Sequence, residues 1–551
     1  MSRLNDLPDY IKQLVKGHLI SVGFSRADLD KPIVGIVNSW NEIVPGHAPL
    51  RDLAGKVKEG VYKAGGVPLE FNTIAICDGI AQGHKGMKYS LPSRELIADS
   101  IEAMVKGHDI FDALVFLSSC DKVVPGMLMA MARIDIPSIW LGAGPMYNYI
   151  KPIESKMARR NFLEGKISED ELLDITEKYY PGPGVCPFLG TANTMSIIAE
   201  VMGLSLPGAA LTPAGTAQRY NIARLSGEQA VRLAEIGLKP SEIMKKEAFE
   251  DAIAVTVALG GSLNSVIHIP AIARELGIEI TMEDFGRISE KIPLIAEITP
   301  NSDENTVIDL YFSGGVTAVM KELREYLHLD RKTVLNESYE KILERQKNVV
   351  PSRSIIRPVS DPIMKSGGIK VLKGNLAPEG ALLKISALKE RSIDCFEGIA
   401  RVFNSEDEFI EYAFTNELKE GEVIVIRYEG PRGGPGMREL HRCVEIINKN
   451  KNVALVTDGR LSGASYGISV AYVSPEAAAG GPISVVKNGD VIRIDLREKT
   501  IDLLISQEEF NERTRHITTS KNDNYHFNSK NSYLKYYQFF VGSASKGAVR
   551  K

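Results

Sequence analysis

The stretch Ser119-Cys120-Asp121-Lys122-Val123-Val124-Pro125-Gly126 directly follows the apolar run Ala113–Leu117. The apolar run predicts a buried strand, and Pro125 suits the first turn of a helix, where its missing N–H leaves no bond unmade. Ligands of open α/β sheets bind beyond the carboxyl ends of the strands. We therefore expect Cys120, Asp121 and Lys122 to face a binding site that holds a metal.

Two further apolar runs end in polar residues in the same way. Residues 73–76 precede Cys77-Asp78-Gly79, and residues 32–37 precede Asn38-Ser39-Trp40-Asn41-Glu42. The intervening residues 50–64 and 94–106 have the amphipathic pattern of helices. This alternation predicts βαβ units around a parallel sheet, with three strand ends offering polar atoms to one edge.

The composition is that of a globular enzyme acting on a small-molecule substrate. The 551 residues are too many for one ordinary core; 44% are hydrophobic and 25% charged. Lys and Arg number 66 against 70 Asp and Glu, for a net charge of -4, so no basic field attracts nucleic acid.

The chain also lacks the sequence signs of export or membrane insertion. Its first residues contain no signal-like apolar core, and no stretch approaches the ~20 apolar residues of a membrane span. We expect a cytoplasmic protein. Its odd number of scattered cysteines then indicates metal ligands or free thiols rather than disulfides. These cysteines are Cys77, Cys120, Cys186, Cys395 and Cys443.

Changes in composition and in the expected secondary structure along the chain predict two domains. Residues 1–350 read as an α/β domain with a parallel sheet, and residues 193–327 within it as mostly helical. Residues 351–368, rich in Pro and Gly, read as a linker, and residues 369–551 as a β-rich, barrel-like domain with a helix near 438–447. Its expected strands are 369–372, 382–385, 422–428, 453–457, 483–486 and 491–494.

Cys120 beside Asp121 indicates two different metals. Thiolates select iron–sulfur clusters or zinc, whereas carboxylates select magnesium or manganese. The alternative is a buried cysteine next to an Asp121–Lys122 salt bridge; the second pair, Cys77 and Asp78, favours the metal interpretation. The absence of CxxC spacing argues against a structural zinc site.

Four other features allow both a functional and an ordinary structural interpretation. Cys186, in a Gly/Pro loop, could ligate a metal or simply fill the core. The glycine-rich residues 430–436 could bind a phosphate or carboxylate, although they lack the ending of a P-loop. His47, His84 and His268 are assigned mainly to loop hydrogen bonds. Glu439 taken alone looks like a solvated helix residue.

Ser462 follows a predicted strand on a tight turn, within the sequence Thr457-Asp458-Gly459-Arg460-Leu461-Ser462-Gly463. It could be a hydrolase nucleophile, a catalytic base, or a serine that bonds its own turn. The aromatic C-terminal tail, residues 525–540, is expected to pack on its own domain or on a partner subunit rather than on nucleic acid.

Together these motifs resemble the dihydroxy-acid dehydratase and sugar-acid dehydratase family, from about residue 10 to residue 550. The matching stretches are 38–47, 77–81, 89–95, 120–126, 373–380, 427–437 and 455–463.

The resemblance implies a cofactor for each group of residues. Mg²⁺ would be held by Asp78, Asp121, Glu439 and a carbamylated Lys122. An iron–sulfur cluster, 2Fe-2S or 4Fe-4S, would be held by cysteines that include Cys120 and Cys186. Ser462 would be the base, Glu439 and Ser462 would reach the site from the C-terminal domain, and the enzyme would be a homodimer.

The chain departs from the family pattern at three places. Gly46 stands where two-iron members have a cysteine, so Cys77 is our candidate for the third thiolate. The Cys186 loop lacks the usual neighbouring cysteines and Ser-Gly-Met. Residues 260–264 depart from the usual Ser-Thr-Asn.

The leading hypothesis is a hydro-lyase that converts a 2,3-dihydroxy carboxylate to a 2-keto acid, with 2,3-dihydroxyisovalerate of branched-chain amino-acid biosynthesis as substrate. The alternatives are an aldonate dehydratase, a serine hydrolase built on Ser462, and a non-catalytic paralogue without a cluster.

Overall fold

The computed structural model describes residues 3–388, 394–447, 452–461, 467–519 and 532–551. Its N-terminal part contains a four-stranded sheet in the order β2-β1-β3-β4, with all neighbours parallel. The parallel sheet predicted from the sequence is therefore confirmed. The strands are β1 (Ile33–Asn38), β2 (Val67–Asn72), β3 (Ala113–Leu117) and β4 (Ser138–Leu141).

Helices alternate with these strands and cover the sheet. α2 (Leu50–Lys63) joins β1 to β2, α4 (Ser90–His108) precedes β3, and α5 (Val123–Ile134) joins β3 to β4. Every residue of β1, β3 and β4 is buried, as expected for a parallel sheet covered on both faces. The start of α5 consequently lies at the carboxyl end of β3.

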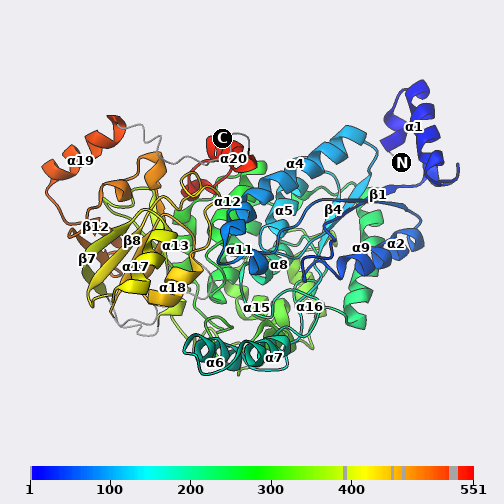
Figure 1. Ribbon diagram of the computed structural model, residues 1–551. Helices are drawn as coiled ribbons and strands as arrows, with labels where there is room; N and C mark the ends of the chain where they lie inside the picture. The colour runs from blue at the N-terminus through cyan, green and yellow to red at the C-terminus, as the bar shows by residue number, and fades with distance from the viewer. Residues whose placement is uncertain (1–2, 389–393, 448–451, 462–466, 520–531) are drawn as a thin grey trace.

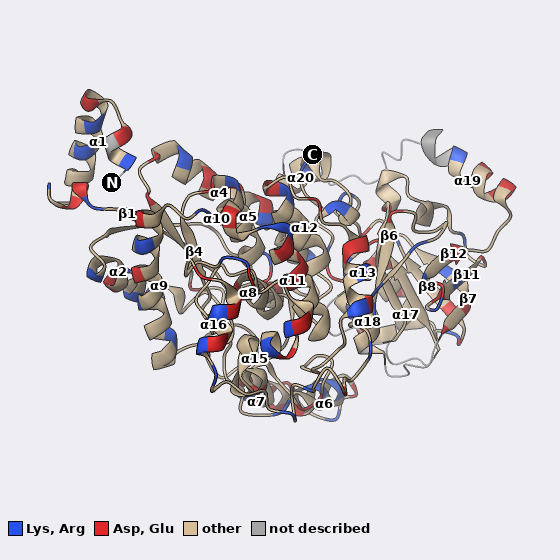
Figure 2. Ribbon diagram, turned by 180° about the vertical axis from the view of Figure 1, so that it is seen from behind, with Lys and Arg blue, Asp and Glu red and all other residues tan. Residues whose placement is uncertain are grey.

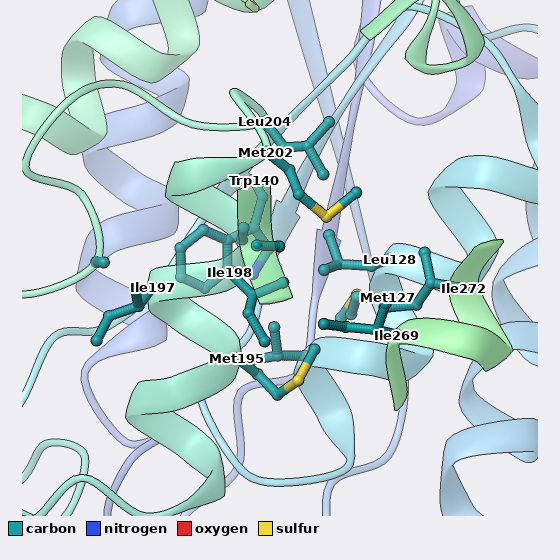
Figure 3. Close-up of a cluster of buried hydrophobic side chains, with 14 of the residues drawn as sticks. Met127, Leu128, Trp140, Met195, Ile197, Ile198, Met202, Leu204, Ile269 and Ile272 are labelled. Atoms are coloured by element: carbon teal, nitrogen blue, oxygen red, sulfur yellow. The ribbon is translucent and has the colours of Figure 1, made fainter. Parts of the chain in front are cut away.

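The core of this part forms around α5. Apolar side chains of α5, β4, α8 (Thr191–Val201) and α12 (Ser265–Glu275) interlock there, among them Trp140 and Met195 (Figure 3). The prediction that residues 193–327 are mostly helical is confirmed. None of the described helices is long and apolar enough to cross a membrane.

The remaining helices of the described residues are α1 (Asp9–Ser21), α3 (Asp78–Ala81), α6 (Pro152–Leu163), α7 (Glu169–Tyr179), α9 (Ala217–Ile236), α10 (Pro240–Ile243), α11 (Lys246–Ala258), α13 (Met282–Lys291), α14 (Val307–Phe312), α15 (Gly315–Glu322), α16 (Tyr339–Arg345), α17 (Glu406–Thr415), α18 (His441–Ile447), α19 (Gln507–Thr519) and α20 (Tyr533–Phe540).

The C-terminal part is an eight-stranded sheet in the order β12-β11-β7-β8-β9-β10-β6-β5 (Figure 1). A bridge between Lys373 and Thr500 joins its two edges, so the sheet is nearly closed into a barrel, as predicted. The strands are β5 (Ile369–Leu372), β6 (Gly380–Lys384), β7 (Cys395–Phe403), β8 (Glu422–Ile426), β9 (Ala454–Thr457), β10 (Ser469–Ser474), β11 (Val491–Asp495) and β12 (Thr500–Leu503).

Two predicted strands are wrong. Residues 73–76 are irregular, because β2 ends at Asn72 and a connecting segment leads to Cys77. Residues 483–486 overlap a 3-10 helix, Pro482–Val485. The helix begins at Pro482, because proline has a fixed φ and no N–H and therefore suits the first position of a helix. In the C-terminal sheet, β7, β10 and β12 were not predicted. In β7, exposed residues such as Glu397 alternate with buried ones, which breaks up the apolar run.

The C-terminal tail crosses back to the N-terminal part of the molecule, where α20 lies near α4 and α12 (Figure 1). The Tyr533 hydroxyl donates to the Pro92 carbonyl at 2.6 Å. The buried Arg94 guanidinium donates to the carbonyls of Gly547 and Ala548, each at 2.9 Å. The described part of the tail is therefore a contact between the two halves of the chain.

Arg94→Ala should destabilise the protein, because it leaves Glu95 and the tail carbonyls without their buried donor. We expect a loss of about 3–5 kcal/mol in the free energy of unfolding, measured by chemical denaturation. Arg287→Ala is the control: Arg287 is 47% exposed and should change stability by less than about 1 kcal/mol. Equal effects of the two substitutions would contradict this account of the tail.

Candidate active site

Three carboxylates from both halves of the chain converge. Asp78 is the first residue of α3, Asp121 lies between β3 and α5, and Glu439 lies just before α18. One oxygen of each lies within 4.8 Å of the others, a spacing that could hold a metal ion. The structure thus brings together the carboxylates that the sequence nominated.

Lys122 lies within reach of all three carboxylates. Its Nζ is 2.7 Å from Asp78, 3.5 Å from Glu439 and 3.8 Å from Asp121, and the side chain is 1% exposed. The Ser90 hydroxyl donates a further hydrogen bond to Asp78. As an ammonium, Lys122 is a counter-ion inside the cluster; as a carbamate, it would add oxygen ligands to it.

Glu439 is oriented by a network of buried side chains. Arg460 donates to Glu439 Oε1 at 2.9 Å, and the Asn264 amide donates to the same oxygen at 2.7 Å. Asn264 Oδ1 in turn accepts from Arg460 at 3.0 Å and from the Tyr472 hydroxyl at 2.7 Å. Glu439 is therefore a buried, bonded carboxylate, and its interpretation as a solvated helix residue is wrong.

A close approach of backbone segments brings the Glu439 loop to the cluster. A Cβ at Gly436 would lie 2.0 Å from the Lys88 carbonyl oxygen, and Gly436 has φ +86°. Only glycine satisfies both constraints without strain. The loop from the barrel can consequently pack against Lys88, just before α4. The first residue of α4 is Ser90.

The cluster contains more negative than positive charge. Burial and the neighbouring Asp78 carboxylate raise the pKa of Asp121 to about 7. Burial alone would also raise the pKa of Asp78, but the charges of Lys122 and Arg460 hold it below its ordinary value. One further cation at this position would relieve the repulsion between the carboxylates.

Three of the five cysteines lie beside the carboxylates. Cys77 and Cys120 are close enough for a hydrogen bond, which lowers the pKa of the Cys77 thiol to about 7 and contributes to a raised pKa of Cys120. Burial raises the pKa of Cys186 to about 12, and the nearby Cys77 adds to that rise. The structure therefore gathers the three thiols that we had named as cluster ligands.

His47 positions Cys120. The backbone N–H of Cys120 donates to His47 Nε2 at 3.1 Å, so Nδ1 carries the proton and donates to the Ser39 carbonyl at 2.8 Å. Burial lowers the pKa of His47 to about 4, which keeps this imidazole neutral. The prediction of loop hydrogen bonding by His47 is confirmed.

Gly46 also lies against Cys120. A Cβ at Gly46 would be 3.1 Å from Cys120 Sγ. A cysteine at this position would therefore reach the same thiols. In this chain Cys77 is a thiol next to Cys120, and its role as the third cluster ligand stays a prediction.

These groups line one cavity of about 640 Å³. Its wall includes the carboxylates Asp78, Asp121 and Glu439, the thiols of Cys77, Cys120 and Cys186, the apolar Ile80, Met146 and Phe188, and the polar or charged Lys156, Arg159, Tyr179 and Tyr180. Lys122, Asn264 and Arg460 support the carboxylates from behind this wall.

Two other features that the sequence suggested, Ser462 and the glycine-rich loop 430–436, are not seen to contribute to this cavity among the described residues. Ser462 lies outside the described residues. In the glycine-rich loop, the N–H groups of Arg432 and Gly433 bind the chain's own Glu476 carboxylate at 2.8–3.1 Å. The loop therefore binds an internal anion and leaves no support for a phosphate site there.

Sequence reasoning assigned no role to Asn264, Arg460 or Tyr472. Asn264 and Arg460 stand in stretches already singled out, residues 260–264 and 457–463, so a signal existed for them. Tyr472 lies inside a strand that was not predicted, with no signal of its own.

The donor sets fit the two cofactors that the sequence suggested. Buried carboxylate oxygens suit a hard cation such as Mg²⁺, and three thiols suit an iron–sulfur cluster. If Mg²⁺ binds, Asp78, Asp121 and Glu439 would be its protein ligands. If a cluster binds, Cys77, Cys120 and Cys186 would hold it.

Asp121→Asn should stabilise the metal-free protein while abolishing its response to Mg²⁺. Because the folded pKa of Asp121 is about 7 against an ordinary 3.8, its contribution to stability is present at low pH and is lost as the pH rises toward 7. We expect the variant to be more stable by about 1–3 kcal/mol at pH 8 and nearly equal at pH 4.

Thermal melts with and without Mg²⁺ test this expectation. Mg²⁺ should raise the melting temperature of the wild-type protein and leave that of Asp121→Asn unchanged. A variant that is less stable than the wild type at pH 8, or that still responds to Mg²⁺, would refute the assignment.

The fold and the site define a class of α/β protein in which a parallel sheet and a barrel-shaped sheet both contribute to one cavity of carboxylates and thiols. Residues 31–342 match the family model of the dihydroxy-acid/6-phosphogluconate dehydratase N-terminal domain, and residues 354–548 match that of the C-terminal domain. The chain belongs to the dihydroxy-acid/6-phosphogluconate dehydratase family.

Relatives named dihydroxy-acid dehydratase match nearly the whole chain. The protein from Pyrococcus abyssi is 48% identical over 542 residues, covering 96% of each chain. The proteins from Methanococcus aeolicus and Acetivibrio thermocellus are 45% and 44% identical, covering 97% and 96% of both chains.

Proposed function

We propose that this protein is a hydro-lyase that dehydrates a 2,3-dihydroxy carboxylic acid to a 2-keto acid. The observation that carries the proposal is that three carboxylates and three thiols line one cavity, in a chain that matches dihydroxy-acid dehydratases along nearly its whole length. The leading substrate is 2,3-dihydroxyisovalerate of branched-chain amino-acid biosynthesis. An aldonate is the alternative.

The chain's own residues have distinct parts in this reaction. Asp78, Asp121 and Glu439 form the end of the cavity that would receive the substrate's carboxylate and C2 hydroxyl together with Mg²⁺. Arg460 and Asn264 fix the Glu439 oxygen. Bound Mg²⁺ and an iron–sulfur cluster would supply charge stabilisation at C1 and C2 and Lewis acidity at the C3 hydroxyl.

The proton at C2 needs a base, and Ser462 remains the predicted one. In the sequence Ser462 follows Arg460 by two residues, and the Arg460 guanidinium is bonded to Glu439. This adjacency in the chain supports a base on the barrel side of the cavity. Loss of the C2 proton and the C3 hydroxide as water leaves an enol, which tautomerises to the 2-keto acid.

The apolar part of the cavity supports a short branched substrate. Ile80, Met146 and Phe188 line it, and burial of a small alkyl group against such side chains contributes about 0.8 kcal/mol per methylene. We also propose a homodimer located in the cytoplasm, on the sequence alone. Size-exclusion chromatography with light scattering checks the oligomeric state.

Turnover of 2,3-dihydroxyisovalerate, gluconate and xylonate by anaerobically purified enzyme tests the proposal. We expect 2-keto acid from the first acid, and its formation should stop on chelation of Mg²⁺. Glu439→Gln should lower kcat/KM about 100-fold, and Glu397→Gln, at an exposed position of β7, should not. Turnover of sugar acids only would select the alternative, and activity that survives chelation would favour a hydrolase.

Cys77→Ser tests the third thiol. Because Cys77 lies beside Cys120, we expect the variant to lose most of its iron and sulfide, measured by chemical analysis and by the visible absorption of the purified protein. Cys395→Ser is the matched control, since Cys395 is exposed and lies outside the cavity. A full cluster in Cys77→Ser would exclude Cys77 as a ligand.

A further inference from the structure

Helices α6 and α7 form a hairpin, residues 150–180, at the lower edge of the molecule, where both views show them side by side (Figures 1 and 2). Burial raises the pKa of Tyr180, and negative charge at Cys186 and Cys77 raises it further, so the hairpin lies on the thiol side of the cavity. Its outer side is exposed, as at Met157. The hairpin residues that line the cavity are Pro152, Lys156, Arg159, Tyr179 and Tyr180.

The hairpin buries little of itself against the rest of the protein. The buried residues of α6 are Pro152, Ser155 and Ala158, and that of α7 is Tyr179. Every residue of α8, the next helix along the chain, is buried. Among the described helices and strands, α6 and α7 pack mainly on each other. Because local opening costs least where few apolar contacts are buried, this hairpin is the part of the cavity wall that can separate most easily.

One short segment, residues 299–304, holds the hairpin in place and is called the latch here. Both acids of the latch, Asp303 and Glu304, are 57% exposed, and ion pairs as exposed as theirs stabilise a contact only weakly. The contacts are Lys156 with Asp303 at 2.6 Å, Lys151 with Glu304, Lys156 Nζ with the Pro300 carbonyl at 3.3 Å, and the Ile153 N–H with the Asp303 carbonyl at 3.0 Å.

Both ends of the hairpin meet at a narrow base. The Tyr149 N–H donates to the Lys178 carbonyl at 2.9 Å, so the chain enters and leaves the hairpin at one point. The chain then passes through Gly182-Pro183-Gly184, whose last residue has φ +149°, and small residues of this kind suit a hinge. Cys186 is held beyond this hinge, because the Asn193 amide donates to its carbonyl at 2.8 Å. The hairpin can therefore move while Cys186 stays in place.

The thiols need an opening in the cavity wall. Cys120 is 8% exposed, and an iron–sulfur cluster must contact the sulfur atoms directly if it is to bind there. The wall around Glu439 is fixed by the buried side chains of Arg460 and Asn264. The α6–α7 hairpin has no comparable buried network, so it is the wall that can move.

We propose that the α6–α7 hairpin is a lid that opens on its base and exposes Cys77, Cys120 and Cys186, so that an iron–sulfur cluster can enter and leave the site. Closed, the lid separates the thiols from solvent. Opening breaks the contacts of the latch and leaves both sheets and the carboxylates in place. The inference goes beyond the proposed function, because it does not depend on which acid the enzyme dehydrates.

Substitutions in the latch test the lid. Asp303→Lys puts two cations together and should favour the open hairpin, and Asp303 itself does not line the cavity. Asp303→Lys/Lys156→Glu restores the ion pair with its charges exchanged and should close the hairpin again. Lys332→Glu is the matched control, since Lys332 forms an exposed ion pair with Glu242 away from the cavity.

Two measurements on the full-length protein report opening independently of turnover. Hydrogen exchange followed by mass spectrometry, on the anaerobically purified protein, gives the opening of residues 152–179. Alkylation by iodoacetamide, after any bound iron has been removed by chelation, gives the labelling rate of each cysteine. Cys395, which is exposed, and Cys443, which is fully buried outside the cavity, are internal controls. Cys443 should react only when the whole protein unfolds.

We expect Cys120 of the wild-type protein to react at least about 10-fold faster than Cys443, because the lid opens without unfolding. Asp303→Lys should raise hydrogen exchange of residues 152–179 and the labelling of Cys120 and Cys186 about 3-fold to 10-fold. The rates of Cys395 and Cys443 should stay unchanged. The double variant should return to within about 2-fold of the wild type, and Lys332→Glu should match it.

The lid is refuted if Cys120 and Cys443 of the wild-type protein react at the same rate, because the thiols would then be reached only by unfolding. It is also refuted if Asp303→Lys changes neither measurement, or if the single and double variants are labelled equally fast. The expected rates in a protein that dehydrates none of the tested acids would refute the proposed function and leave the lid standing.

Discussion

The structure depends on holding three carboxylates together at a boundary between two halves of one chain. Like charges at this spacing repel, and burial strengthens the repulsion because less water screens it. Lys122 offsets part of it from the N-terminal side, and Arg460 offsets part from the barrel side. Burial and the remaining repulsion from Asp78 together raise the pKa of Asp121. Further positive charge or a proton at this position would relieve the remaining repulsion.

The support around Glu439 shows how the fold maintains this arrangement. Asn264 comes from the helical part of the chain, and Arg460 and Tyr472 come from the barrel. Asn264 bonds both Arg460 and Tyr472, and Asn264 and Arg460 bond the carboxylate. The contact of Arg94 with the C-terminal tail fastens the same two halves elsewhere.

Thiols and carboxylates occupy neighbouring parts of one wall for a chemical reason. In the proposed reaction, a hard cation would need oxygen ligands and an iron–sulfur cluster would need thiolates, so both donor types would have to lie side by side to hold one small acid. The alternation of Cys77 with Asp78 and of Cys120 with Asp121 achieves this within two segments.

Much of this protein could be predicted from its residues before any coordinates. Apolar runs followed by polar pairs, as at Ala113–Leu117 and Cys120-Asp121, predict the parallel sheet and the edge at which the cavity lies. Both predictions succeed because the burial of a strand and the ligand chemistry of a side chain are local properties of the sequence. Alternating strands such as β7 escaped detection, since exposed residues interrupt their apolar pattern.

The meeting of Glu439 with Lys122, the neutral tautomer of His47, and the binding of Glu476 by the glycine-rich loop needed the tertiary structure. Each depends on segments far apart in sequence, and the burial and pairing of a charge are decided only when those segments pack together.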